Sequence, residues 1–234
     1  MTNTAEREKH VRVGRHIKDV VYAANDGIVT TFAVVAATVG GSLSPLTILV
    51  VGIANLFADG FSMASGDYLG SKSEQDFYAK EERNEYREVR EKPDDEREEI
   101  RDILTRKGYH GADLEEMVRL VVANKTMWVD LMMHDELGMQ KPSGASPLQS
   151  AMLTFVSFVA AGSIPLLPYI LLGTEAPFRF AVASTATALF TVGALRSVFS
   201  GRSWIFCGLE MLFVGGSAAA LSYGIGALLS STIG

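Results

Sequence analysis

The stretch "DGFSMASGDYLGSKSEQDFYAKEERNEYREVREKPDDEREEI", Asp59–Ile100, begins with the composition of a membrane helix and ends as a highly charged segment. Its first residues are small or apolar except for Asp59 and Asp67, and its remainder is rich in helix-forming Glu, Lys and Arg. No strong helix breaker occurs before Pro93, and the residue before a proline disfavours helix. The stretch therefore predicts one helix that leaves a membrane and continues in water to Glu91.

The net charge of the whole chain lies in the polar segment that follows. The 234 residues are 48% hydrophobic with a mean hydropathy of +0.19. Lys72–Lys141 holds 19 acidic and 13 basic residues, which accounts for the full net charge of −6. The regions on either side, Val20–Leu69 and Ala151–Gly234, are apolar and rich in small residues. This pattern predicts an integral membrane protein in a lipid bilayer with an acidic insert, and it argues against nucleic acid as a partner.

Several other classes of protein are disfavoured by what the sequence contains. Cys207 is the only cysteine, so no disulfide framework or thiolate metal cluster is expected. No Walker-type nucleotide motif occurs, so ATP hydrolysis is not the expected energy source. We expect the protein to use no organic cofactor and not to be an enzyme. The basic stretch Arg7–Lys18 precedes an apolar run of spanning length without a cleavage site, which argues against a cleavable signal peptide.

Five segments have the length of about 20 apolar residues that a spanning helix needs. They are Val20–Gly40, Leu46–Leu69, Leu148–Leu172, Phe178–Arg196 and Trp204–Leu229. The predicted fold is all-α: a polytopic membrane protein with five transmembrane helices and a cytoplasmic three-helix insert between the second and third. The predicted divisions are a cytoplasmic N-terminal segment (1–19), helices one and two (20–71), the cytoplasmic insert (72–141) and helices three to five (142–234). Pro165 and Pro168 should kink the third helix.

Lysine and arginine define the expected orientation. Basic residues are frequent before the first span, throughout the insert and at Arg196 and Arg202, and they are absent from the turn after the first span. By the positive-inside rule, the N-terminus and the insert are expected in the cytoplasm.

Ionisable residues inside the predicted spans indicate function, because a carboxylate at the bilayer centre costs about 2.5–3.5 kcal/mol. Asp26 lies in the first span, Asn55, Asp59 and Met63 follow one face of the second, and Glu210 lies in the fifth. Each acid has a structural alternative, which is pairing with a buried base or capping a helix end. Carboxylate oxygen together with thioether sulfur favours transition metals over Mg²⁺ or Ca²⁺.

The insert carries acidic residues three apart on successive predicted helices. Its helices are expected to be the extension to Glu91, a second over Pro93–Gly108 and a third over Asp113–Leu137. The pairs are Glu85 and Glu88, then Glu96 and Glu99, with Met132, Met133 and Glu136 on the third helix. Carboxylates from facing helices build metal sites in helical bundles, although a solvated charged face is the ordinary interpretation of any one glutamate. His110 and His134 are weaker candidates.

These motifs resemble the vacuolar iron transporter family. The resemblance covers nearly the whole chain and rests on four segments: "NDGIVTTFAVVAATVGG", "ANLFADGFSMASGDYLGSKSE", "MMHDELGM" and "GRSWIFCGLEMLFVGGSAAALSYGIG". It implies a homodimer that exports Fe²⁺ from the cytoplasm in exchange for protons along a path between the subunits. It implies that Asp26 and Met63 line this path.

The resemblance also implies which residues of the insert bind metal. They are Glu85, Glu88, Glu96, Glu99, Met132, Met133 and Glu136, with Glu81 and Glu82 as neighbouring candidates. Mn²⁺, Zn²⁺, Co²⁺ or Ni²⁺ are alternative substrates for such ligands. The membrane is expected to be vacuolar or a prokaryotic plasma membrane.

Two functions of other classes remain open at this stage. A ferritin-like iron oxidase on a membrane anchor would usually carry Glu-x-x-His pairs, and the insert has none. A metal-regulated membrane scaffold without transport is the second alternative, which flux measurements would distinguish.

Overall fold

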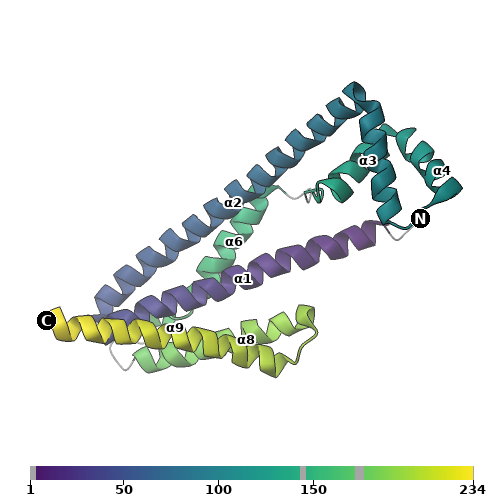
Figure 1. Ribbon diagram of the computed structural model, residues 1–234. Coiled ribbons are helices and arrows are strands. Elements are labelled where there is room, and N and C mark those ends of the chain that lie inside the picture. Colours follow the sequence, from purple (N-terminus) through teal and green to yellow (C-terminus); the bar gives the residue numbers. More distant parts are fainter. Residues whose placement is uncertain (1–3, 143–145, 172–176, 234) are drawn as a thin grey trace. The chain divides into compact units, whose positions relative to one another are not determined.

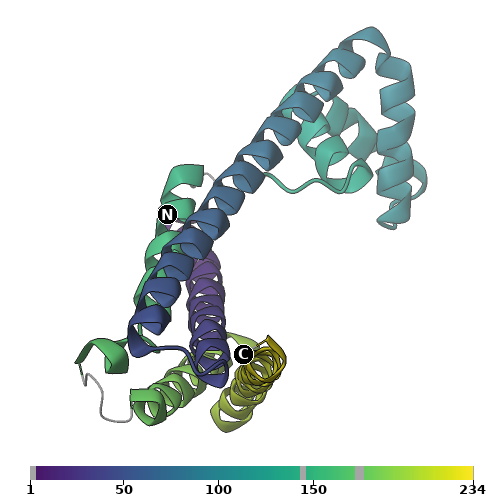
Figure 2. The ribbon, with the colours of Figure 1, turned by 90° about the vertical axis from the view of Figure 1, so that its left-hand side faces the viewer.

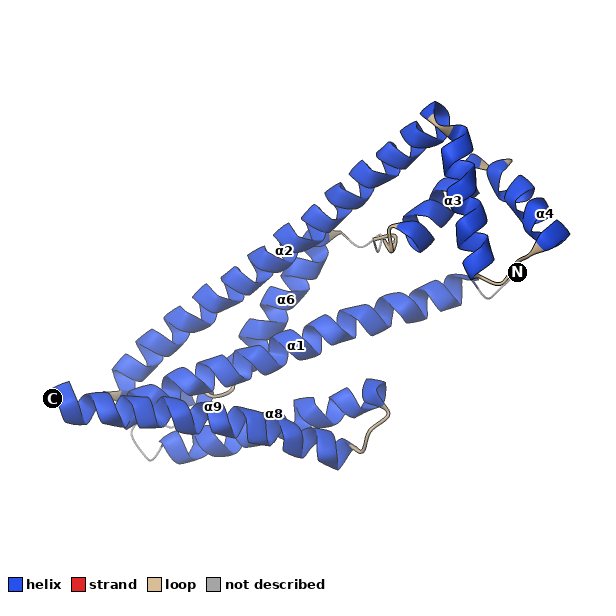
Figure 3. Cartoon of the chain, viewed as in Figure 1, coloured by secondary structure: helices blue, strands red, loops and turns tan. Residues whose placement is uncertain are grey.

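The computed structural model describes residues 4–142, 146–171 and 177–233, and within these ranges all regular structure is helical (Figure 3). The helices are α1 (Thr4–Gly40), α2 (Pro45–Glu91), α3 (Pro93–Arg106), α4 (Gly111–Val122), α5 (Lys125–Leu131), the π-helix η1 (Met132–Glu136), α6 (Pro147–Gly162), α7 (Leu167–Leu171), α8 (Pro177–Ser200) and α9 (Trp204–Ile233). The all-α prediction is confirmed for the described residues.

The chain divides into two compact units. The membrane unit comprises Met1–Tyr68 and Ala145–Gly234, and the insert unit comprises Leu69–Gly144. Helix α2 contributes to both, and Figure 1 shows it as one uninterrupted helix. The predicted continuation of the second span to Glu91 is therefore confirmed. Pro93 opens α3 at once, because proline suits the first turn of a helix.

Within the part of the chain that the structure describes, four helices are long and apolar enough to cross a membrane. By length and composition these segments are Lys18–Gly40, the α2 helix, Pro177–Val198 and Trp204–Thr232. Helices α8 and α9 run side by side, which Figures 1 and 2 both show. These segments correspond to four of the five predicted spans.

The remaining predicted span, Leu148–Leu172, is not a single helix. Helix α6 has 16 residues, or about 24 Å, which is shorter than a hydrocarbon core of about 30 Å. A turn over residues 163–166 separates it from the five-residue α7. The buried Pro165 lies in this turn and offers no N–H for a helical hydrogen bond. The expected kink is therefore a full interruption; the last residue of the predicted span, Leu172, lies outside the described residues.

Glycines allow the helices of the membrane unit to approach closely. A β-carbon at Gly27 would lie 2.4 Å from a main-chain oxygen of α6, and one at Gly226 would lie 2.0 Å from a main-chain oxygen of α1. At Gly193 the corresponding distance to an oxygen of α9 is 2.6 Å. In α9, small residues that permit close helix contact thus serve this purpose at Gly226, whereas Gly216 and Gly224 face open space.

The insert unit has its own apolar core. Its buried residues come from every helix of the unit: Tyr78, Val89, Ile100, Ile103, Leu104, Val118, Val121, Trp128, Val129, Met132 and Met133. The predicted third helix, Asp113–Leu137, is wrong as a single element. It is interrupted at Asn124, whose side chain accepts a hydrogen bond from the Met127 N–H at 3.2 Å and starts α5. The unit therefore has more helices than the three expected.

Candidate functional site

Two carboxylates of the membrane unit lie close enough to repel each other. Asp26 comes from α1 and Asp59 from α2, and both are half-buried. The Asn55 side-chain amide donates a hydrogen bond to Asp59 Oδ2 at 2.7 Å, which fixes that carboxylate. Met63 lies one turn further along α2, is partly buried and packs against the apolar core of the unit. An amide, a carboxylate and a thioether thus follow successive turns of α2, and the Asp26 carboxylate of α1 lies close enough to interact with Asp59.

The other acids of the spans have protein partners. Asp67 accepts a hydrogen bond from the Thr154 hydroxyl of α6 at 2.9 Å. Glu210 of α9 lies 3.2 Å from the Arg196 guanidinium of α8. The alternative of pairing with a base therefore applies to Glu210, although its Oε2 is buried without a hydrogen bond from the described residues, and its place in the transport path stays a prediction.

Two carboxylates of the insert unit are buried with one oxygen each lacking a hydrogen bond among the described residues. Glu85 of α2 is 5% exposed and Glu96 of α3 is 4% exposed. Among the described residues, no hydrogen-bond donor reaches Oε2 of either side chain. Burial, reinforced by neighbouring glutamates, raises the pKa of each from 4.5 to about 7. Buried polar atoms are normally hydrogen-bonded, so these two oxygens call for a ligand or a proton.

Three further glutamates, Glu88, Glu99 and Glu136, interact electrostatically with Glu85 and complete a group of five. We call this group the glutamate cluster: Glu85, Glu88, Glu96, Glu99 and Glu136. Partial burial raises the pKa of Glu136. The negative charge of Glu99 and the hydrogen bond between Glu99 and Glu136 raise it further. The Glu136 side chain nevertheless remains exposed to solvent. The cluster draws on α2, α3 and η1, so three elements contribute to one electrostatic environment. Its members repel one another, and no three His, Cys, Asp or Glu side chains of the described residues form a ready-made group for a metal.

The methionine pair lies in the apolar core of the insert, on the same π-helix as Glu136. Met132 and Met133 are 0% and 1% exposed.

The other candidates of the insert lie outside the glutamate cluster. Glu81 accepts a hydrogen bond from Asn84 at 3.1 Å and pairs with Lys80 at 3.3 Å, and these contacts lower its pKa. Glu82 is half-buried, and His110 and His134 are exposed.

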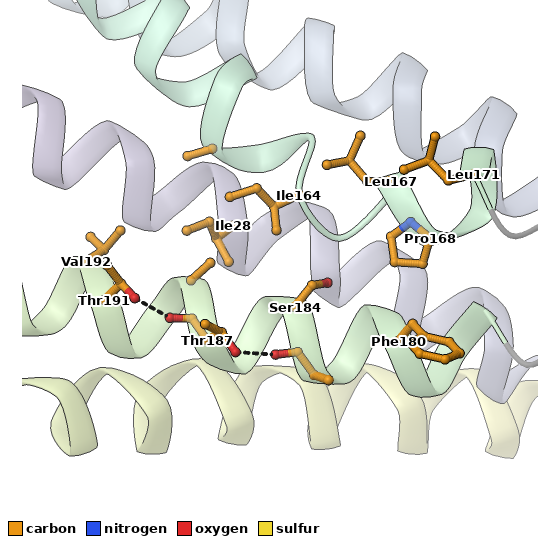
Figure 4. A pocket seen from close by; sticks show the side chains of 13 residues that line it. Ile28, Ile164, Leu167, Pro168, Leu171, Phe180, Ser184, Thr187, Thr191 and Val192 are labelled. Atoms are coloured by element: carbon orange, nitrogen blue, oxygen red, sulfur yellow. Dashed lines mark hydrogen bonds between the residues drawn. The ribbon is translucent and has the colours of Figure 1, made fainter.

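A pocket of about 690 Å³ in the membrane unit was not foreseen from the sequence. It opens at the interruption between α6 and α7 and is lined by apolar side chains of α1, α6, α7 and α8 (Figure 4). Three hydroxyls of α8 also line it, and each donates to a carbonyl of its own helix: Ser184, Thr187 and Thr191. No charged residue lines the pocket, so its chemistry does not suit a metal ion. The prolines of the third span were the only signal for it.

Comparison with known proteins places these features in a family. The profile of the VIT family matches residues 17–227. The chain is 35% identical over 217 residues to vacuolar iron transporter 1 of Arabidopsis thaliana, covering 92% of this chain and 87% of that protein. It is 33% identical over 228 residues to the vacuolar iron transporter of Centaurea cyanus, covering 97% and 93%. For the vacuolar iron transporter of Toxoplasma gondii the identity is 34%, covering 97% of this chain and 79% of that protein. The chain therefore belongs to the VIT family.

Proposed function

We propose that the protein exports divalent transition metal, with Fe²⁺ as the main substrate, from the cytoplasm in exchange for protons. The relatives that it matches are named vacuolar iron transporters, which supports iron as the substrate and a vacuolar-type membrane as the location. The observation that carries the proposal is the pair Asp26 and Asp59, two mutually repelling carboxylates on helices long and apolar enough to span a bilayer.

The membrane step uses the carboxylate pair and its neighbours. A divalent cation or a proton relieves the repulsion between two nearby carboxylates, so the two compete for the same oxygens. Competition of this kind is what exchange of metal for protons requires. Met63 adds a soft ligand that favours Fe²⁺ over Mg²⁺, and Asn55 orients Asp59 through its 2.7 Å hydrogen bond.

The insert captures metal before the membrane step. A metal ion bound by Glu85 and Glu96 would satisfy the two buried oxygens that lack hydrogen-bond donors. Glu88, Glu99 and Glu136 would supply further oxygens, and Met132 and Met133 would supply sulfur. The acidic surface of the insert raises the local concentration of cations around it. In this proposal the N-terminus and the insert face the cytoplasm.

The working form is proposed to be a homodimer with five crossings per subunit. The interrupted α6–α7 segment would provide the third crossing, with its turn buried among neighbouring helices as such breaks require. Apolar side chains of α2 remain exposed within the subunit, among them Phe57 at 50% and Phe61 at 70%. The second subunit is proposed to supply a second copy of Asp26 and of Met63 to one metal ion.

Metal flux in proteoliposomes tests the proposal. The wild-type protein should take up Fe²⁺ when a pH gradient is imposed, and Asp26→Asn should reduce this uptake at least ~10-fold, because the amide carries no charge to exchange. Asp67→Asn is the matched control, since an amide oxygen can still accept the Thr154 hydrogen bond. Full proton-coupled uptake by Asp26→Asn would refute the exchange mechanism. A panel of Mn²⁺, Zn²⁺, Co²⁺ and Ni²⁺ competitors defines the substrate.

A further inference from the structure

The π-helix η1 gives the methionine pair an unusual geometry. The Leu137 N–H donates to the Met132 carbonyl at 3.1 Å, which is a bond from residue i+5 to residue i. Such a turn holds more residues than the about 3.6 of an α-helix, so consecutive side chains point in more similar directions. This explains how two adjacent residues, Met132 and Met133, are both almost fully buried. Single π-turns are rare and occur frequently at functional sites.

Two contacts hold this turn in place. At its end the chain reverses through Gly138 at φ +64°, and the Met139 N–H donates to the Met133 carbonyl at 2.8 Å. The second contact is an ion pair between Lys107 Nζ and Asp135 Oδ1 at 2.6 Å. Lys107 directly follows α3, the helix that carries Glu96 and Glu99. The pair therefore ties the π-turn to a helix of the glutamate cluster, across 28 residues of sequence.

This ion pair opposes a repulsion within the cluster. Glu99 on α3 and Glu136 on η1 lie within hydrogen-bond reach of each other, and when both are ionised their like charges drive the two elements apart. The Lys107–Asp135 attraction acts between the same two elements and favours their approach. The Asp135 side chain is 18% exposed and the Lys107 side chain 44% exposed, so water shields the attraction on the lysine side more than on the carboxylate side.

We infer that the Lys107–Asp135 ion pair is a positioning contact that holds η1 against α3 and thereby sets the affinity of the insert for soft divalent metals. The inference rests on the proposed metal binding by the insert. Holding ligands in the bound arrangement before metal arrives reduces the cost of ordering them. Because η1 contributes the thioethers, the contact affects Co²⁺, which accepts thioether sulfur more readily, more than the harder Mn²⁺.

Calorimetric titration of the purified full-length protein with Co²⁺ and with Mn²⁺ tests this inference. Lys107→Met should weaken Co²⁺ binding about three- to ten-fold and Mn²⁺ binding less. The substitution leaves the Asp135 carboxylate intact, so the loss does not come from removing a ligand. If Asp135 were itself a metal ligand, Lys107→Met would release it and strengthen binding. The exchanged pair, Lys107→Glu with Asp135→Lys, should restore most of the affinity and the preference for Co²⁺.

A second ion pair of the insert unit provides the matched control. Arg101 of α3 donates to Glu115 of α4 at 3.0 Å and also pairs with Glu98 of its own helix, so Arg101→Met should leave the ratio of Co²⁺ to Mn²⁺ affinity unchanged. If Lys107→Met bound Co²⁺ and Mn²⁺ with the affinities of the wild-type protein, the positioning role would be refuted, while metal binding by the insert would stand. Absence of Co²⁺ binding by the wild-type protein would instead refute metal binding by the insert.

Discussion

The burial of Glu85 and Glu96 is the residue-level feature that distinguishes the insert from a solvated charged surface. A buried carboxylate without a donor is destabilising, because it loses hydration without compensation. The exposed glutamates of the same helices, such as Glu91, carry no such cost. The pattern of charges in the sequence does not separate these two kinds of glutamate, since both recur at helical spacing.

Replacing one of these buried carboxylates should separate stability from binding. At pH 7.5, Glu96→Gln should stabilise the metal-free insert by ~1–2 kcal/mol, because the amide carries no charge to desolvate. The same variant should weaken Co²⁺ binding by at least ~10-fold, since a charged ligand is lost. Thermal unfolding followed by circular dichroism and calorimetric titration measure the two effects. Glu91→Gln, at an exposed position, should change neither, and parallel losses of stability and binding in Glu96→Gln would contradict the argument.

At the level of helices, close glycine contacts determine how the membrane unit packs. A β-carbon at Gly226 would meet a main-chain oxygen of α1 at 2.0 Å, and backbone cannot yield as a flexible side chain does. Gly226→Ala should therefore destabilise the detergent-solubilised protein by about 1–3 kcal/mol. Gly224→Ala lies on the same helix in open space and should be neutral or stabilising by up to ~1 kcal/mol. The fraction of each variant that stays monodisperse after heating measures this difference. Equal fractions for Gly226→Ala and Gly224→Ala would exclude a specific α1–α9 contact at Gly226.

Local signals predicted some elements of the fold and could not predict others. The continuous α2 followed from composition and from Pro93, and the caps at Gly108 and Gly138 have the positive φ expected of helix-terminating glycines. The break at Pro165 was expected only as a kink, because the outcome depends on which neighbours satisfy the freed backbone groups.

Other features depend on tertiary contacts that sequence periodicity does not report. The restart of the helix at Asn124 competes with simple continuation, and the π-turn depends on how Met132 and Met133 pack in the core. The pairing of Glu210 with Arg196 joins two helices across a turn, so charge counting within one span missed it. The sequence therefore identified the candidate ligands by type and spacing, while their burial and partners came from the three-dimensional arrangement.

For the whole molecule, the raised pKa values of Glu85 and Glu96 make the metal-free protein sensitive to pH. In the folded insert the pKa of each is about 7, compared with 4.5 when unperturbed, so the folded state binds more protons than the unfolded state between these values. The stability that this contributes is fully present below pH 4.5 and is lost as the pH rises through 7. A metal ion that binds the ionised carboxylates reverses the trend, because it stabilises only the folded state.

The unfolding temperature of the insert should therefore respond to metal and protons in opposite ways. Without metal it should fall between pH 5 and pH 8, and each kcal/mol lost corresponds to about 4–8 °C in a unit of this size. Adding Co²⁺ should raise it at pH 8 and have little effect at pH 5, where protons occupy the same oxygens. The double variant Glu85→Gln with Glu96→Gln should flatten the metal-free pH profile and remove most of the Co²⁺ effect. A wild-type protein that Co²⁺ stabilises equally at pH 5 and pH 8 would show that protons and metal do not share these carboxylates, and capture of metal by the insert would then be independent of the proton gradient.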